Sequence, residues 1–305
     1  MTFDIIDRSA ERLMTWAGLT DALQAGHRLP RAEIGDTFLY RTPDTLLSRS
    51  AWIDGLGLAV KAASVFPGNP GKGLPMVNGV VNLFSDTTGQ LEALVDFHLV
   101  TKWKTAGDSL LSAKLLARPD SRDILIVGAG TVGRSMIEAY GTLFPGARFT
   151  VWNRSAAAAV QMAQQVPGLV VASDLQEAVE SADIIASCTM ASAPLVKGDW
   201  LRPGTHLDLI GAYRPDMREV DDDAMRRARV FVDSRATTLH HIGELMAPLA
   251  SGAITEDDVQ ADFYDIAAGL YTRLSDTEIT IAKNGGGAHL DLMTSRYILD
   301  QWRTR

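Results

Sequence analysis

Residues Asp123–Gly133, with the sequence DILIVGAGTVG, give the clearest indication of the fold of this chain. An apolar run typical of a buried strand breaks into a G-x-G-x-x-G turn at Gly128, Gly130 and Gly133. In such a turn the first glycine permits the tight bend, the second lets the main chain approach a pyrophosphate, and the third lets the next helix pack closely on the strand. Four apolar residues share one face of the helix expected behind the turn: Met136, Ile137, Tyr140 and Leu143. The pattern predicts a Rossmann-type dinucleotide site, and a glycine turn in another α/β fold is the alternative.

The phosphates of the dinucleotide are expected at the start of that helix. Free N–H groups and the positive end of the helix dipole attract anions there. The expected cofactor contacts in this stretch are Gly128, Gly130, Thr131, Val132 and Gly133.

The end of the second predicted strand indicates which dinucleotide binds. Strand 148–152 is followed by Asn153, Arg154 and Ser155, and Asn153 lies twenty residues past Gly133. A site for NAD usually has a carboxylate near this point, which accepts a hydrogen bond from the ribose 2′-OH. Here an amide, a guanidinium and a hydroxyl would instead meet a 2′-phosphate, so we expect NADPH rather than NADH. The alternative is that Arg154 is only a solvated loop residue.

Composition excludes several classes of protein. The 305 residues suffice for two domains, and a formal net charge of −8 gives no basic surface, so nucleic acid is not an expected partner. The single cysteine, Cys188, rules out an internal disulfide and fits a reducing compartment. No Cys/His cluster at metal-binding spacing, no signal peptide and no apolar run of membrane-spanning length is found in the sequence. The expected location is the cytoplasm, with no metal and no membrane contact.

Residues 1–117 are expected to form a first, α+β domain. Helices are predicted at 7–25 and 101–116, and strands at 45–53, 57–65, 77–84 and 91–100. Short turns between consecutive strands favour a largely antiparallel sheet.

Residues 118–287 alternate strands with helices, which predicts a doubly wound parallel sheet with right-handed crossovers. Strands are expected at 123–127, 147–152, 168–172, 183–187, 205–210, 229–233 and 278–283. A C-terminal helix within 288–305 is expected to return to the first domain. The predicted fold class is α/β, a Rossmann-type domain plus this second α+β domain.

Two lysines and an aspartate are candidates for the chemistry. Lys61 is the only charge in the predicted strand 57–65, so it either meets an anion or extends its ammonium to solvent at an edge. Lys104 and Asp108 stand four residues apart on one helix face. They form either a surface ion pair or a functional pair, in which the ammonium binds a substrate carboxylate and Asp108 transfers a proton.

Other polar residues are weaker candidates. Arg31, Arg41 and Arg49 could clamp a carboxylate, and Arg49 is favoured because it interrupts a strand-like run. His98, in a predicted strand, is interpreted as structural. Cys188 and Thr189 follow the fourth parallel strand, where a loop can pass beside the cofactor. Cys188 has no histidine nearby in sequence to activate it as a nucleophile.

The segment His206–Asp221, together with the glycine fingerprint, resembles the ornithine cyclodeaminase/mu-crystallin family. Other pieces match in order and spacing: Val65–Asn69, Lys104–Ala106, Val151–Arg154, Glu278–Thr280, Gly287-Ala288 and Asp291-Leu292. The resemblance covers about residues 45–295.

The resemblance implies a nicotinamide cofactor and a substrate that is an amino acid or its imine. It also implies that Lys61 and Lys104 line the substrate site, and that domain 1–117 binds the substrate and forms a homodimer. The family commonly has arginine where this chain has Lys104. Cyclodeaminases carry a catalytic aspartate in a Gly-Gly-Asp segment, where this chain reads Gly211-Ala212-Tyr213. The resemblance is therefore to the ketimine reductase branch, with Gly211 beside the cofactor.

We expect an NADPH-dependent reductase of cyclic ketimines. The substrates would be Δ1-pyrroline-2-carboxylate or Δ1-piperideine-2-carboxylate, and the products L-proline or L-pipecolate. Arg49, Lys61 and Lys104 would hold the substrate carboxylate, and Asp108 is a hypothetical proton donor. Alternatives are an ornithine cyclodeaminase, an alanine dehydrogenase-like oxidoreductase, and a non-enzymatic NADPH-binding protein of the crystallin type.

Overall fold

The computed structural model describes residues 3–305 and divides them into two compact units. The first unit holds the chain up to Lys104 together with Gly287–Arg305, and the second holds Thr105–Gly286. The division falls inside helix α2 (Phe97–Leu116), whereas the sequence placed it behind that helix, after residue 117.

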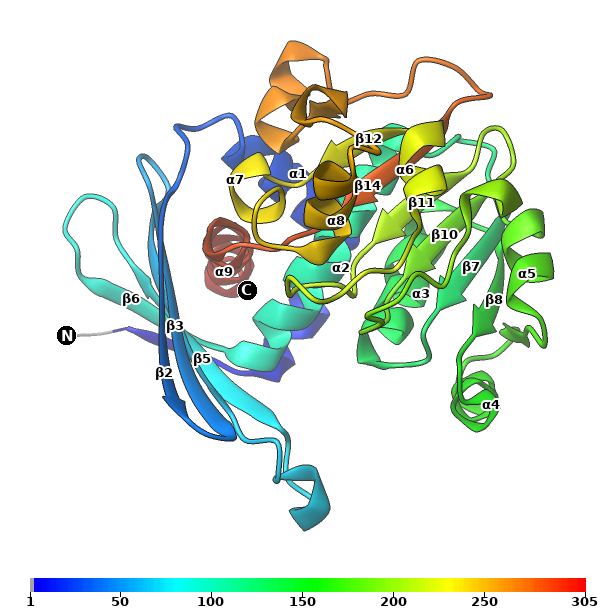
Figure 1. Cartoon of the computed structure of the whole chain (residues 1–305). Coiled ribbons are helices and arrows are strands. Elements are labelled where there is room, and N and C mark those ends of the chain that lie inside the picture. The colour runs from blue at the N-terminus through cyan, green and yellow to red at the C-terminus, as the bar shows by residue number, and fades with distance from the viewer. Residues whose placement is uncertain (1–2) are drawn as a thin grey trace. The chain divides into compact units, whose positions relative to one another are not determined.

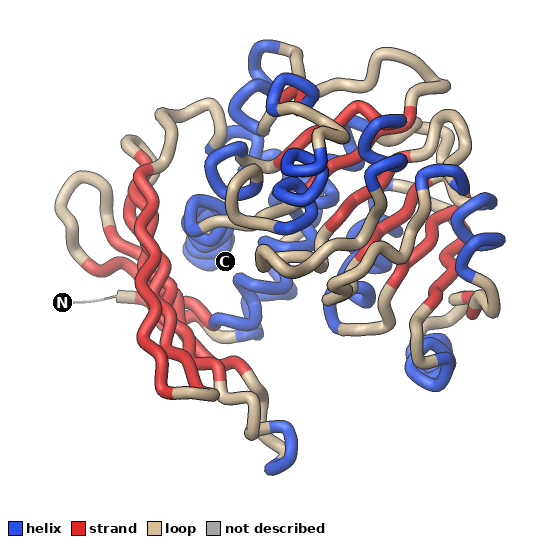
Figure 2. The backbone as a smooth tube through the Cα atoms, viewed as in Figure 1, coloured by secondary structure: helices blue, strands red, loops and turns tan. Residues whose placement is uncertain are grey.

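The first unit is a six-stranded sheet in the order β1-β6-β5-β4-β3-β2. Its strands are β1 (Asp4–Ile6), β2 (Glu33–Arg41), β3 (Asp44–Ile53), β4 (Gly57–Val65), β5 (Val77–Phe84) and β6 (Leu91–Asp96). Strands β2 to β6 pair antiparallel, and β1 pairs parallel with β6. Figure 2 draws the strands of this sheet in red. The largely antiparallel sheet is therefore confirmed.

Helical segments complete the first unit: η1 (Arg8–Leu13), α1 (Trp16–Gly26), η2 (Pro70–Lys72), the start of α2, and α9 (Ala288–Arg303). Helix α9, red in Figure 1, lies against the blue and cyan sheet, and its first half is buried. Helix α1 packs closely on α9, because a Cβ at Gly26 would meet the Met293 sulfur at 2.6 Å. The C-terminal helix therefore returns to the first unit, as predicted.

Three local predictions in this unit differ from the structure. The strand expected at 91–100 ends at Asp96, because the Asp96 carboxylate accepts a hydrogen bond from the Leu99 N–H at 2.7 Å and so starts α2. His98 therefore lies in a helix and not in a strand. The helix expected at 7–25 is divided at Thr15, whose hydroxyl caps α1 by accepting from the Gly18 N–H. Strands β1 and β2 were missed, and β2 is exposed along its whole length.

The second unit is an eight-stranded, wholly parallel sheet in the order β13-β12-β14-β11-β10-β7-β8-β9. Its strands are β7 (Asp123–Val127), β8 (Arg148–Trp152), β9 (Val170–Val171), β10 (Ile184–Ser187), β11 (His206–Leu209), β12 (Ala228–Val232), β13 (Val259–Ala261) and β14 (Ile279–Lys283). Strand order reverses at β7, which has β8 on one side and β10 on the other. Ligands of doubly wound sheets bind outside the carboxyl ends of the strands at such a switch point. The predicted Rossmann-type fold is confirmed.

Helices connect these strands: α3 (Thr131–Leu143), α4 (Ala156–Gln165), α5 (Leu175–Ser181), α6 (Asp222–Arg227), α7 (Arg235–Thr238) and α8 (Gly243–Ser251). Short 3-10 segments are η3 (Gly198–Trp200), η4 (Glu256–Asp258) and η5 (Phe263–Ala268). Within residues 3–305, no helix has both the length and the apolar character needed to cross a membrane.

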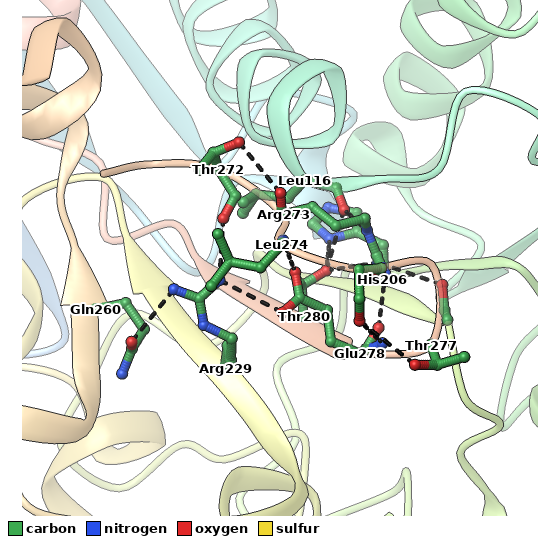
Figure 3. Close-up of polar contacts among 12 residues, drawn as sticks. Leu116, His206, Arg229, Gln260, Thr272, Arg273, Leu274, Thr277, Glu278 and Thr280 are labelled. Atoms are coloured by element: carbon green, nitrogen blue, oxygen red, sulfur yellow. Dashed lines mark hydrogen bonds and ion pairs between the residues drawn. The ribbon is translucent and has the colours of Figure 1, made fainter. Parts of the chain in front are cut away.

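Polar contacts anchor the amino ends of β11, β12 and β14 (Figure 3). The Arg273 guanidinium donates to the main-chain oxygens of Leu116 and Glu278 and to the Thr280 hydroxyl. Arg229, at the start of β12, forms an ion pair with Glu278 at 3.4 Å. Side chains of the unit itself thus hold the amino ends of these strands. The glycine turn lies at the opposite, carboxyl ends of the strands of this sheet.

Candidate functional site

The glycine turn between β7 and α3 has the geometry of a phosphate cradle. Gly128 has φ of +115°, a region that favours glycine. A Cβ at Gly133 would overlap the Gly128 carbonyl oxygen and lie 2.9 Å from the Ile126 side chain. At Gly130, the N-cap of α3, a Cβ would meet nothing within 4 Å, and no side chain caps the helix there. The fold thus requires glycine at 128 and 133, and the open space at 130 fits a bound pyrophosphate.

Asn153 braces this turn from the end of β8. Its Oδ1 accepts from the Ala129 N–H at 3.0 Å, and its Nδ2 donates to the Ser155 carbonyl at 3.0 Å. Its amide, expected to meet a 2′-phosphate, is therefore already engaged by the main chain at both ends. Arg154 and Ser155 are exposed, and the Ser155 hydroxyl does not cap α4. Both side chains are therefore open to solvent at the end of β8.

The loops after β10 and β11 meet the glycine turn at the carboxyl edge of the sheet. A Cβ at Gly128 would lie 2.9 Å from the Cys188 carbonyl oxygen, and a Cβ at Gly211 would overlap the main chain of Thr189. The structure thus brings together Gly128, Cys188, Thr189 and Gly211, which the sequence placed beside the cofactor. Burial, with the carboxylates of Glu219 and Asp208, raises the pKa of the Cys188 thiol well above its usual value. A thiol held neutral is a poor nucleophile, in agreement with the sequence interpretation.

In the first unit, a cluster of cations lies on one face of the sheet. Arg49 on β3 and Lys61 on β4 stand directly opposite each other, so their side chains share a face. The Lys61 ammonium donates to Asp291 Oδ1 at 3.0 Å and to Thr101 Oγ1 at 3.1 Å, and lies 4.7 Å from the centre of the Phe97 ring. Lys61 is only 8% exposed, so its ammonium does not extend to solvent.

Burial lowers the pKa of Lys61; Asp291 opposes this shift, and the charges of Lys104 and Arg49 add to it. Burial also lowers the pKa of His289 well below its usual value, with contributions from His27, Lys104 and Arg49. Arg49, Lys61 and Lys104 therefore act on the same region of the first unit. Lys104 makes no hydrogen bond or ion pair with any residue from 3 to 305, and its ammonium can receive an anion.

Asp291 is a site residue to which the sequence analysis gave no role. It lies in the first turn of α9, is 1% exposed, and its Oδ2 accepts no hydrogen bond from the described residues. The sequence signal that could have revealed Asp291 is a carboxylate among apolar residues of a helix that directly follows three glycines, Gly285–Gly287.

The other sequence candidates take different positions. Arg49 is held by Asp36 on β2 through three hydrogen bonds of 2.8–3.1 Å. Arg41 instead pairs with Asp44 at the end of its hairpin, with its side chain 80% exposed, and Arg31 is exposed ahead of β2. Asp108 is 1% exposed, so the interpretation as a surface ion pair is wrong. Asp108 lies in the second unit, where its charge acts on buried Lys283.

Comparison with known proteins places these features in a family. The profile of the ornithine cyclodeaminase/mu-crystallin family matches residues 53–305. A Δ1-pyrroline-2-carboxylate reductase of Paracoccus denitrificans is 53% identical over 291 residues, covering 93% of this chain and 92% of that protein.

Two solved structures are similar over nearly the whole chain. One is Thermococcus litoralis Δ1-pyrroline-2-carboxylate reductase in complex with NADH and L-proline, with a TM-score of 0.90, 27% identity, and coverage of 99% of this chain and 98% of that one. The other is an archaeal alanine dehydrogenase dimer with bound NAD, with a TM-score of 0.89, 27% identity, and coverage of 100% and 97%.

Proposed function

Since the chain belongs to the ornithine cyclodeaminase/mu-crystallin family, we propose that it reduces the cyclic ketimines Δ1-pyrroline-2-carboxylate and Δ1-piperideine-2-carboxylate to L-proline and L-pipecolate. It is a nicotinamide-dependent oxidoreductase that acts on C=N bonds.

The arrangement of charges around Lys61 carries the proposal. A cyclic imino acid has a carboxylate and a nitrogen that becomes cationic on protonation. The first unit offers both complements, because Lys104 and Arg49, the latter already paired with Asp36, supply positive charge and buried Asp291 supplies negative charge 3.0 Å from Lys61. Cations alone would disfavour a protonated imine, and the Asp291 carboxylate offsets that effect.

The chain's residues then bind, orient and protonate the substrate. Bound nicotinamide supplies the hydride that reduces the C=N carbon. Lys104 and Arg49 hold the carboxylate and so fix the ring. Lys61, whose pKa is lowered by burial, gives a proton from Nζ to the imine nitrogen and is reprotonated when release of the product admits water to the site.

Asp108 is the second candidate for the proton donor. Replacing Asp108 by asparagine would lower turnover more than substrate binding if the carboxyl group delivers the proton. Unchanged turnover in Asp108→Asn would leave the step to Lys61, and Lys61→Met would then abolish it.

NADPH is the proposed reductant. Exposed Arg154 and Ser155, with no carboxylate at the end of β8, support a 2′-phosphate site. Similar structures carry NADH or NAD, so calorimetry with both reduced cofactors is the appropriate test. The proposal expects tighter binding of NADPH, and equal or tighter binding of NADH would overturn this preference.

A substrate panel separates the proposed activity from its alternatives. Oxidation of NADPH with either cyclic ketimine, and none with pyruvate plus ammonia, would support the proposal. Activity with pyruvate plus ammonia would instead indicate an alanine dehydrogenase, like the similar archaeal structure. Ammonia release from ornithine without net cofactor turnover would indicate a cyclodeaminase. Tight cofactor binding without any turnover would indicate a crystallin-like binding protein.

The protein is also proposed to form a homodimer through the sheet of the first unit. Strand β2 is a long edge strand with large exposed apolar side chains, among them Leu39 at 62% and Tyr40 at 74%. Leu39 pairs across the strands with Leu46, which is 49% exposed. Light scattering is expected to give twice the chain mass, and Leu39→Asp to give the monomer. A monomeric parent protein would refute this assembly.

A further inference from the structure

Glu219 is a fully buried carboxylate that accepts five hydrogen bonds at the carboxyl edge of the parallel sheet. Its Oε1 accepts from the Ser187 hydroxyl at 2.6 Å, the Thr189 N–H at 2.8 Å and the Thr189 hydroxyl at 2.9 Å. Its Oε2 accepts from the N–H groups of Gly211 at 2.8 Å and Ala212 at 3.2 Å. One carboxylate therefore joins the chain segments that follow β10 and β11.

The segment after β10 lies directly against the glycine turn, and the segment after β11 lies against the segment after β10. The main chain of Cys188 blocks a Cβ at Gly128, and the main chain of Thr189 blocks a Cβ at Gly211. A shift of either segment would change the surface at the carboxyl ends of β10 and β11. In doubly wound sheets the nicotinamide half of a dinucleotide lies at the carboxyl ends of strands such as these.

We propose that Glu219 is a positioning residue for hydride transfer, which holds segments 187–189 and 211–212 where they receive the nicotinamide half of the cofactor. The inference rests on the proposed function, because it needs a nicotinamide cofactor on the glycine turn. Glu219 itself contacts neither cofactor nor substrate in this role. It is the main chain of Thr189 and Gly211 that does so.

The surroundings of Glu219 fix its position and its charge. Glu244 on α8 accepts from the Glu219 N–H at 2.8 Å and the Val220 N–H at 3.0 Å. The ammonium of Lys283 on β14 donates to the Leu209 carbonyl at 2.8 Å and is buried within reach of the charges of Glu219 and Glu244. All five groups bonded to the Glu219 carboxylate can act as donors, which matches an ionised carboxylate acting only as acceptor.

The substitution Glu219→Gln would keep the shape of the side chain but could not accept all five of its hydrogen bonds. Its amide has one acceptor oxygen, so its NH₂ group must face either the Thr189 N–H or the pair from Gly211 and Ala212. In either orientation a buried main-chain N–H loses its acceptor and the segment carrying it must move. A displacement of about 1 Å near the reacting atoms can cost about 100-fold in rate.

The test compares Glu219→Gln with the unaltered full-length protein. We expect kcat with a cyclic ketimine to fall about 10- to 100-fold. Affinity for NADPH should fall, while affinity for ADP-ribose, which lacks the nicotinamide and the 2′-phosphate, should stay within about 2-fold, because the phosphate cradle is unchanged. Asp262→Asn is the matched control, since Asp262 is an equally buried carboxylate that caps η5 instead of the cofactor loops.

Three results would overturn the inference. Wild-type kcat in Glu219→Gln would remove any positioning role, and an equal loss of affinity for ADP-ribose and NADPH would show a general structural role. If Asp262→Asn lowers kcat as much, the effect is one of stability alone.

A second variant covers the case in which Glu219→Gln does not fold. Ser187→Ala/Thr189→Val removes two donors from Oε1 and keeps the carboxylate, so kcat should fall about 3- to 10-fold with ADP-ribose affinity intact. Wild-type kcat in this double variant would count against the inference. If the parent protein reduces no imine, the proposed function fails, and the comparison of NADPH with ADP-ribose still judges the role of Glu219.

Discussion

Replacing Lys61 tests whether its ammonium and the Asp291 carboxylate behave as one buried ion pair. The two atoms are 3.0 Å apart, and the side chains are 10% and 2% exposed. At an effective dielectric constant of about 20, charges at this distance attract by about 5–6 kcal/mol. Desolvation opposes this gain, and burial is the largest influence on the pKa of Lys61. The pair should therefore stabilise the fold little, while either charge alone should be costly.

Three variants measure this: Lys61→Met, Asp291→Asn and the double substitution. Each single change should lower the free energy of unfolding by about 3–5 kcal/mol, because it leaves one buried charge uncompensated. The double variant should lose no more than either single one, which gives a coupling energy of about 3 kcal/mol.

Urea unfolding supplies the readout. Four of the six tryptophans lie in the first unit, where Trp16 and Trp103 stack at 4.0 Å, so tryptophan fluorescence reports mainly on the same unit as the ion pair. Arg41→Met is the matched control, since it removes the exposed ion pair with Asp44 and should cost at most about 1 kcal/mol. Additive losses in the double variant, with no coupling energy, would refute the reasoning.

The remaining predictions concern the second unit. Gly130→Ala should keep the melting temperature of the protein and lose NADPH binding, because the new Cβ enters open space where the pyrophosphate is expected. Gly133→Ala should instead lower the melting temperature, since its Cβ would meet the Gly128 carbonyl. Arg154→Ala should weaken NADPH binding about 10-fold and leave NADH unchanged, whereas Arg148→Ala, at the other end of β8, should affect neither; equal losses for both cofactors would contradict the 2′-phosphate assignment. Burial and the charge of Glu219 raise the pKa of Glu244 from 4.5 to about 7. The folded state therefore retains a proton that the unfolded state releases. The free energy of unfolding should fall by about 3 kcal/mol as the pH rises from about 4.5 to beyond 7. Urea unfolding of Glu244→Gln over this range should lack that decline, and an unchanged pH dependence would count against the shift.

Local patterns were sufficient to predict the glycine turn and the strands around it. The positive φ of Gly128 and the contact of Gly133 with the Gly128 carbonyl are local features, so sequence spacing reveals them. Strand β4 was also predicted with its observed bounds, Gly57–Val65, because its apolar run and flanking turns are local signals. Strand β2 gave no such signal, since both of its faces are exposed and no alternation marks it.

The missed site residues depend on partners that are distant in sequence. Asp291 meets Lys61 across 230 positions, and Glu219 meets Ser187 across 32. No spacing rule connects such residues, so only the folded chain shows that they touch. Asp108 shows where burial decides between alternatives that spacing leaves open, because its spacing from Lys104 allowed a surface ion pair that its burial excludes.

The proposed imine reduction is best measured by steady-state oxidation of NADPH with Δ1-pyrroline-2-carboxylate, with chromatographic identification of the product. We expect one L-proline formed for each NADPH oxidised, faster turnover than with NADH, and no turnover in Lys61→Met. Sustained cofactor binding without formation of proline, or full activity in Lys61→Met, would contradict it.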